Sequence, residues 1–304
     1  MAKTLHSTTH RATTVLLPDL ISAIPYAARR NPHTDSVTDA SDNWILEKAD
    51  FSVLQERKFR GIKAGYLSGR SYIDCGPEEL RNITDLIGLL FCVDDWSDEF
   101  DTAGTKGAVQ CIMDTLYHPS TYYSSTVLGI AIHSAVLHET VDRELGNIPI
   151  LHDYIQLRRD TSACKPLFAL IEYGCKINLP DRVIEHPVII ELEDTANDSV
   201  SWQNVRNSPL NGTELSLISC IQQDILSFNI EQSKGQTHNL VVVLMHEKDI
   251  GYQAAIEQAA KMVRDTIVRF ETHRAQLPSW GPERDEIVAK WSKDKGDSES
   301  PPAS

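Results

Sequence analysis

Apolar residues recur along most of this chain at the three- and four-residue spacing that is typical of helices packed on a core. Alternation of the kind found in strands is scarce, and the β-branched run Leu240–Leu244 stands alone, too isolated to build a sheet. Helical patterns joined by short loops predict an all-α fold, a single-domain helical bundle. The predicted helices cover 43–67, 77–98, 107–117, 126–146, 150–160, 164–176, 182–204, 224–231, 238–245, 251–276 and 282–291.

The ends of the chain differ from this pattern. Residues 1–15 are polar, and residues 293–304 are polar and rich in Pro and Ser, so we expect two disordered tails around a folded domain at 16–292. Pro77 and the two acids after it are typical of a helix start. In the first helical stretch the spacing predicts these core positions: Trp44, Leu46, Phe51, Leu54, Phe59 and Ile62.

Composition narrows the class of protein. The 304 residues are 41% hydrophobic and carry a net charge of −14 without a basic stripe, which argues against nucleic acid as a partner. No apolar stretch is long enough to span a membrane, and the N-terminus lacks a signal-peptide pattern. Six scattered cysteines without a CxxC pair suit free thiols in a reducing compartment, so a cytosolic protein is expected. The pattern does not define an oligomeric state.

One apolar helical run ends abruptly in carboxylates. After Leu86–Val93 the chain reads Asp94-Asp95-Trp96-Ser97-Asp98, which places three acids on one helical face. Such like charges repel unless something offsets them, and Mg²⁺ does so while leaving coordination positions for substrate phosphates. The alternative is a solvated acidic helix end, but a direct change from apolar to acidic residues favours a helix that opens into a cavity.

A second stretch with potential chemistry runs from Asp224 to Glu231. Ser227 and Glu231 are four residues apart, so a helix would present a hydroxyl and a carboxylate on one face. The position one turn before Ser227 is Gln223, whose amide oxygen is a third candidate ligand.

Together these stretches resemble fungal class I terpene synthases, which cyclise farnesyl diphosphate. The second metal motif of that family reads Asn-Asp-x-x-Ser-x-x-x-Glu. The resemblance covers most of 16–290 and rests on five stretches: Leu17-Pro18-Asp19-Leu20, Asp94–Asp98, Tyr154–Thr161, Asp224–Glu231 and His238-Asn239.

The resemblance implies three Mg²⁺ ions and an isoprenyl diphosphate substrate. The ions would neutralise the diphosphate and make it a leaving group. Asp94 would hold two of them, with Asp98 as a direct or water-mediated partner, and Asp95 is less suited to direct contact. The implied ligands are Asp94, Asp95, Asp98, Asn204, Ser227 and Glu231.

The resemblance also implies residues that bind the diphosphate. Arg159 corresponds to the diphosphate-sensing arginine, with Arg158 as the second choice, and Lys234 is a further residue in reach of phosphate. A surface helix end held by salt bridges is the alternative interpretation of the arginine pair, and a solvated loop is the alternative for Lys234.

A carbocation requires a dry pocket lined with aromatic faces. Phe91 lies one turn before Asp94 on the same face and is the first candidate for this lining, followed by Trp202 and Phe168. Ordinary core packing is the alternative for all three aromatic residues.

The second motif is interrupted. Asn204 joined directly to Asp224 restores the family pattern through Glu231, and the 19 intervening residues, 205–223, correspond to 57 bases. Val205 permits a codon that begins with GT and Gln223 permits CAG, the two ends of a spliced intron. We hypothesise that 205–223 is a retained intron.

Two further departures concern the rest of the chain. The region between Asp101 and Tyr154 is shorter than the family pattern, and the C-terminal Arg-Tyr pair that binds diphosphate is absent. The prediction is a Mg²⁺-dependent sesquiterpene synthase. The alternatives are a catalytically inactive or impaired paralogue and a prenyltransferase, although a chain-elongating enzyme would carry a second DDxxD where this chain has Gln223–Ser227.

Overall fold

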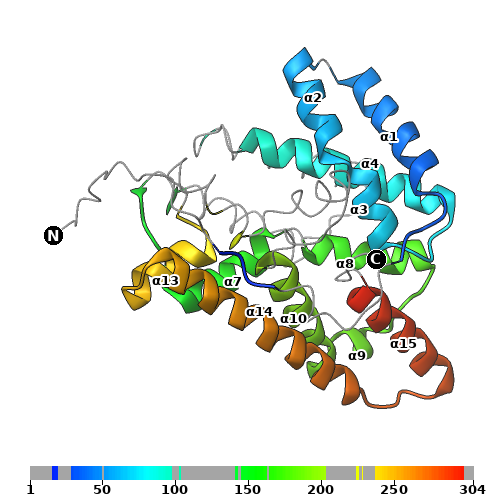
Figure 1. Ribbon diagram of the computed structural model, residues 1–304. Coiled ribbons are helices and arrows are strands. Elements are labelled where there is room, and N and C mark those ends of the chain that lie inside the picture. Colours follow the sequence, from blue (N-terminus) through cyan, green and yellow to red (C-terminus); the bar gives the residue numbers. More distant parts are fainter. Residues whose placement is uncertain are drawn as a thin grey trace.

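The computed structural model describes residues 16–19, 29–49, 51–97, 103, 141–142, 145–162, 164–202, 224–225, 228 and 237–297, with the backbone alone for 93–97 and 293–297. Every element assigned in these ranges is a helix, as the sequence predicts (Figure 1). The helices are α1 (Thr34–Lys48), α2 (Val53–Ile62), α3 (Ala64–Ser71), α4 (Pro77–Ser97), α7 (Leu151–Thr161), α8 (Cys164–Cys175), α9 (Asp181–Ile184), α10 (Pro187–Trp202), α13 (Leu240–Lys248), α14 (Tyr252–Ala275) and α15 (Pro282–Asp297). The predicted helix 107–117, the hypothesised insertion 205–223 and most of the predicted helices 126–146 and 224–231 lie outside the described residues.

The first predicted helix, 43–67, is wrong in its bounds. It is replaced by three helices, because Ser52 forms a capping box with Gln55 that starts α2, and Lys63 adopts a left-handed conformation (φ 54°) that ends it. The prediction 182–204 is likewise divided, and α10 begins at Pro187, where a missing N–H costs nothing. The run 240–244 is helical in α13.

The start of α1 was missed because its buried face is polar. Thr34, Thr38 and Ser41 lie on this face with Ile45. These small side chains let α1 approach α3 so closely that a Cβ on Gly65 or Gly69 would collide with a threonine. Two of the predicted core residues are wrong: Trp44 is 40% exposed because α1 turns the face of Ile45 to the core, and Leu54 is 67% exposed because α2 buries Phe59 instead.

Within the described residues the buried apolar side chains form two large clusters and a small third one made of Ile45, Phe59 and Cys92. The first joins α3, α4, α8, α10 and α15, with Leu80, Ile83 and Ile87 of α4 fully or almost fully buried. The second joins α7 and the end of α10 to α13 and α14. Helix α10 contributes to both clusters and runs beside α14 along much of its length (Figure 1).

The C-terminal boundary of the folded domain differs slightly from the prediction. Helix α15 continues to Asp297, five residues into the predicted tail at 293–304, whereas residues 1–15 and 298–304 lie outside the described part. Within the described ranges, none of the helices combines the length and apolar character needed to cross a bilayer.

Candidate active site

The acid motif lies at the C-terminal end of α4. Pro77 and the acidic first turn fit the start of this helix, and an ion pair between Arg81 and Asp85 (2.8 Å) supports its second turn. Asp94 and Asp95 fall in its last turn, but the structure does not describe their side chains, and Asp98 lies outside the described residues. What the structure does describe is the apolar part of α4 that leads to these acids.

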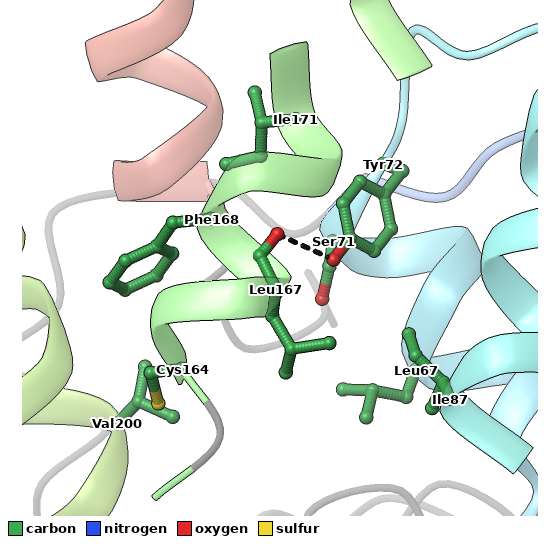
Figure 2. Close-up of a pocket in the computed structure, with 9 residues that line it drawn as sticks. All are labelled: Leu67, Ser71, Tyr72, Ile87, Cys164, Leu167, Phe168, Ile171 and Val200. Atoms are coloured by element: carbon green, nitrogen blue, oxygen red, sulfur yellow. Dashed lines mark hydrogen bonds between the residues drawn. The ribbon is translucent and has the colours of Figure 1, made fainter. Parts of the chain in front are cut away.

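A small cavity lies beside this apolar part of α4 (Figure 2). It has a volume of about 50 Å³, enough for one or two water molecules and well below the size of an ordinary ligand pocket. The Tyr72 hydroxyl donates a hydrogen bond to the Leu167 carbonyl at its edge (2.8 Å). The cavity is lined by Leu67, Ser71, Tyr72, Ile87, Cys164, Leu167, Phe168, Ile171 and Val200.

The cavity is lined mainly by α3 and α8, with one residue each from α4 and α10, the two helices that run towards predicted metal ligands. Ile87 of α4 precedes Asp94 by seven residues, about two helical turns, and Val200 of α10 precedes Asn204 by four. Of the predicted pocket aromatics, Phe168 lines this cavity. Phe91 is half-buried against the first core cluster, and Trp202 is buried in the second.

Arg159 lies against α10. Its Nε and Nη2 donate to the two carboxylate oxygens of Asp198 at 2.7 and 2.6 Å, and Nη1 donates to Asp194 at 2.7 Å. The paired, parallel hydrogen bonds to Asp198 are the strongest geometry available to an arginine and a carboxylate. Sequence reasoning did not single out Asp194 or Asp198, because half of the residues of α10 are polar and neither aspartate stands out among them.

Asn197 holds the same contact between the end of α7 and α10 through hydrogen bonds that involve no charged group. Its amide donates to the Arg159 carbonyl (2.9 Å), and its side-chain oxygen accepts from the hydroxyls of Ser162 (2.8 Å) and Ser201 (3.0 Å). The Arg159 carbonyl is in the last turn of α7, where carbonyls lack partners within the helix. Asn197 therefore ties the end of α7 to α10 just before α8 begins at Cys164.

Arg158 points to a different neighbour. Its Nε lies 3.3 Å from Oδ1 of Asp224, the residue that opens the second acidic stretch, and both side chains are almost fully buried. Asp224 also accepts hydrogen bonds from the Tyr154 hydroxyl and from the backbone N–H of Leu240. The Asn239 amide donates to the Asp224 carbonyl (2.6 Å) and its oxygen caps α13. Asp224 thus joins α7, the second motif and the start of α13.

Burial shifts the pKa values of the two carboxyls in the contact between α7 and α10. Burial raises the pKa of Asp198 above its usual 3.8, and the hydrogen bonds from Arg159 oppose that shift. Burial also raises the pKa of Asp194, against the charge of Arg159. The hydrogen bonds to Asp198 raise the pKa of the Arg159 guanidinium, so it stays charged.

The described part of the structure does not bring the predicted metal ligands together. No group of three His, Cys, Asp or Glu side chains converges within the described ranges. Asn204, Ser227, Glu231 and Lys234 lie outside those ranges, as does Asp98. Of the predicted substrate-binding residues, the structure positions Arg158, Arg159 and Phe91.

The fold is that of class I terpene synthases. The chain is similar to the solved structure "Hedycaryol synthase in complex with HEPES", with a TM-score of 0.73 at 19% identity, over 94% of this chain and 96% of that one. Residues 130–269 match the family described as terpene synthase family 2, C-terminal metal binding.

Sequence relatives define the family more narrowly. The chain is 43% identical to "Sesquiterpene synthase 3" of Postia placenta, over 90% of this chain and 77% of the relative. It is 35% identical to "Sesquiterpene synthase Agr1" of Cyclocybe aegerita, over 90% of this chain and 82% of the relative. The chain therefore belongs to the fungal sesquiterpene synthase family, and its matched C-terminal region is the part of such enzymes that binds a divalent metal.

Proposed function

We propose that this chain ionises farnesyl diphosphate with the help of Mg²⁺ and cyclises the resulting cation to a sesquiterpene, with release of diphosphate. The observation that carries the proposal is the apolar cavity lined by α3, α4, α8 and α10, in which Ile87 lies two turns before Asp94 and Val200 lies four residues before Asn204. An apolar enclosure next to carboxylates suits a substrate with a hydrocarbon chain and a diphosphate head.

The cavity accounts for the hydrocarbon end of the substrate. Leu67, Ile87, Leu167, Phe168 and Val200 offer aliphatic and aromatic surface, and water that entered would quench a cation. At about 50 Å³ the cavity is too small for a fifteen-carbon chain, so binding requires the walls to move apart or the cavity to continue towards the motifs.

The residues proposed for the metals fit magnesium by their chemistry. Asp94, Asp95, Asp98, Asn204, Ser227 and Glu231 all offer oxygen atoms, the donors that Mg²⁺ prefers. Three bound ions would supply the positive charge that turns diphosphate into a leaving group.

The two arginines differ in what surrounds them. Arg159 is paired with two carboxylates on α10, whereas Arg158 is paired with Asp224, the residue that opens the second motif. This arrangement favours Arg158 over Arg159 as the arginine that meets the diphosphate. Lys234, close in sequence to Glu231, is a further candidate for phosphate contact.

The test is direct. Purified protein is incubated with farnesyl diphosphate and Mg²⁺, and the headspace is analysed for sesquiterpene hydrocarbons. We expect hydrocarbon release that stops on chelation of the metal. Detection of longer prenyl diphosphates instead would favour a prenyltransferase, and binding without any product would favour an inactive paralogue.

We further propose that residues 205–223 are a retained intron. Removing them joins Asn204 to Asp224 and restores an uninterrupted second motif. The deletion variant is expected to release more product than the full chain, and cDNA from the source organism is expected to contain transcripts without these 57 bases. Equal or lower turnover in the deletion variant, or retention of the bases in every transcript, would contradict this interpretation.

A further inference from the structure

Two identical side chains, Arg158 and Arg159, stand next to each other on α7 and have different surroundings. Consecutive residues on a helix point about 100° apart, so a rotation of α7 by that angle would bring Arg159 to the direction that Arg158 has now and turn Arg158 away. The buried face of α7, with Tyr154 fully buried and bonded to Asp224, limits such a rotation. Directional polar contacts on the neighbouring face of α7 add a further restraint on which arginine faces Asp224 and the second motif.

We infer that Asp198, assisted by Asp194, is a positioning residue: by holding Arg159 on α10 it fixes the rotation of α7 and so directs Arg158 to the proposed diphosphate site. This inference rests on the function proposed above. Its geometric basis is the three hydrogen bonds of 2.6 to 2.7 Å from one guanidinium to two carboxylates on successive turns of α10. A rotated α7 would leave Asp198, which is 2% exposed, without its charged partner.

Asn197 adds a second restraint at the same corner. The bond from Asn197 to the Arg159 carbonyl fixes the backbone of the residue that Asp198 holds by its side chain. Side-chain and backbone restraints on one residue leave α7 little freedom to turn about its axis or to slide along it. Because Ser162 bonds to the same Asn197, the start of α8, with Cys164 in the cavity wall, is placed by the same contacts.

Because the ion pair between Asp198 and Arg159 is mostly buried, separating it would cost enough free energy to restrain the rotation of α7. An ion pair in water contributes little, but a buried carboxylate that loses its partner is strongly destabilised. The pair between Asp198 of α10 and Arg159 of α7 is mostly buried, whereas the pair between Glu191 of α10 and Arg269 of α14 is about half exposed. Glu191 therefore provides a matched control on the same helix.

The experiment measures binding of inorganic diphosphate with Mg²⁺ to the full chain by calorimetry, below the melting temperature of each variant. Asp198→Asn keeps the shape of the side chain but removes its charge, and we expect the affinity to fall about tenfold. Glu191→Gln should leave the affinity unchanged. Asp198→Glu keeps the charge and should recover part of the affinity, and it also serves as the second variant if Asp198→Asn does not fold.

A structural role alone would not depend on Arg158, so the decisive comparison uses a second background. If Asp198 acts by directing Arg158, the effect of Asp198→Asn should shrink to less than about twofold when Arg158 is already replaced by Lys. An equal effect in both backgrounds, or affinity in Asp198→Asn equal to that in Glu191→Gln, would overturn the inference. A wild-type chain that binds no diphosphate would instead contradict the proposed function, and the inference with it.

Discussion

The two sides of α10 are built on different principles. Towards α14 the contact lies in a region of small and aliphatic side chains, with Leu192 and Ala196 on α10 and Ala259 and Ala260 on α14 fully buried. Towards α7 it consists of ion pairs, of a hydrogen bond that Asn197 donates to the Arg159 carbonyl and of one that it accepts from Ser162. The first contact provides burial, which is non-directional, and the second provides direction.

This difference explains why one helix serves two purposes. The apolar side anchors α10 in the domain, and small shifts there cost little as long as volume is conserved. The ionic side tolerates no equivalent change, because a buried charge must keep its partner in hydrogen-bonding geometry. Substitutions on the two sides should therefore differ in size and in kind.

The largest effect is expected for Asp198→Ala. Removing the carboxylate leaves Arg159 in a mostly buried position with Asp194 as its remaining partner, and the free energy of unfolding should fall by about 4 kcal/mol. Chemical denaturation monitored by circular dichroism measures this loss. A loss below about 1 kcal/mol would place the pair among weak, solvated contacts.

A double replacement sharpens this result. Arg159→Met combined with Asp198→Leu removes both buried charges and should recover much of the lost stability, since apolar residues of similar volume often replace buried ion pairs at little cost. The affinity for diphosphate should not recover together with the stability, because two apolar side chains do not fix the rotation of α7 as the hydrogen-bonded ion pair does. Recovery of both properties would argue against a positioning role.

A smaller effect is expected on the apolar side. Ala260 is fully buried on α14, so Ala260→Leu overpacks the contact and should cost about 2 kcal/mol of unfolding free energy. The affinity for diphosphate, measured at a temperature where the variant is folded, should stay close to that of the wild type. A loss of affinity larger than in Asp198→Asn would show that the apolar side also sets the site.

The helices were largely predictable from the sequence, whereas the arginine arrangement was not. Long periodic segments such as α4 and α14 appear in the sequence because each must bury one face. The start of α1 does not, because Thr34, Thr38 and Ser41 replace apolar residues where α3 approaches. The direction of Arg159 depends on carboxylates 35 and 39 residues away, and no local pattern reports that contact.

The ionic side should also respond to pH. Burial raises the pKa of Asp194 and Asp198 above 3.8, so between 3.8 and the raised values the folded chain binds more protons than the unfolded chain. The contribution of these two groups to stability is therefore greatest at low pH and is lost as the pH rises through that range.

The pH response is measured by comparing wild type with Asp194→Asn/Asp198→Asn. The difference in unfolding free energy, variant minus wild type, should become more positive from pH 4 upwards. The expected size is modest because Arg159 offsets part of the cost of burial. A difference that becomes more negative over this range would mean that the pKa values of the two carboxyls are lowered in the folded chain.

The smallest effect belongs to the exposed pair on α10. Glu191→Gln removes the ion pair with Arg269, and because both side chains are about half exposed, the change should be about 0.3 kcal/mol. Thermal unfolding at low and high salt measures it, and the difference from wild type should vanish at high salt. A loss comparable with that of Asp198→Ala would remove the contrast between buried and exposed pairs.

The central claim is that α7 presents Arg158 to the substrate while α10 retains Arg159. The most direct measurement is a crystal structure of the chain with Mg²⁺ and inorganic diphosphate bound. The account predicts the Arg158 guanidinium within hydrogen-bonding distance of a diphosphate oxygen, with Arg159 still paired to Asp194 and Asp198. A structure in which Arg159 leaves these carboxylates to bind the diphosphate, and Arg158 does not touch it, would contradict the account.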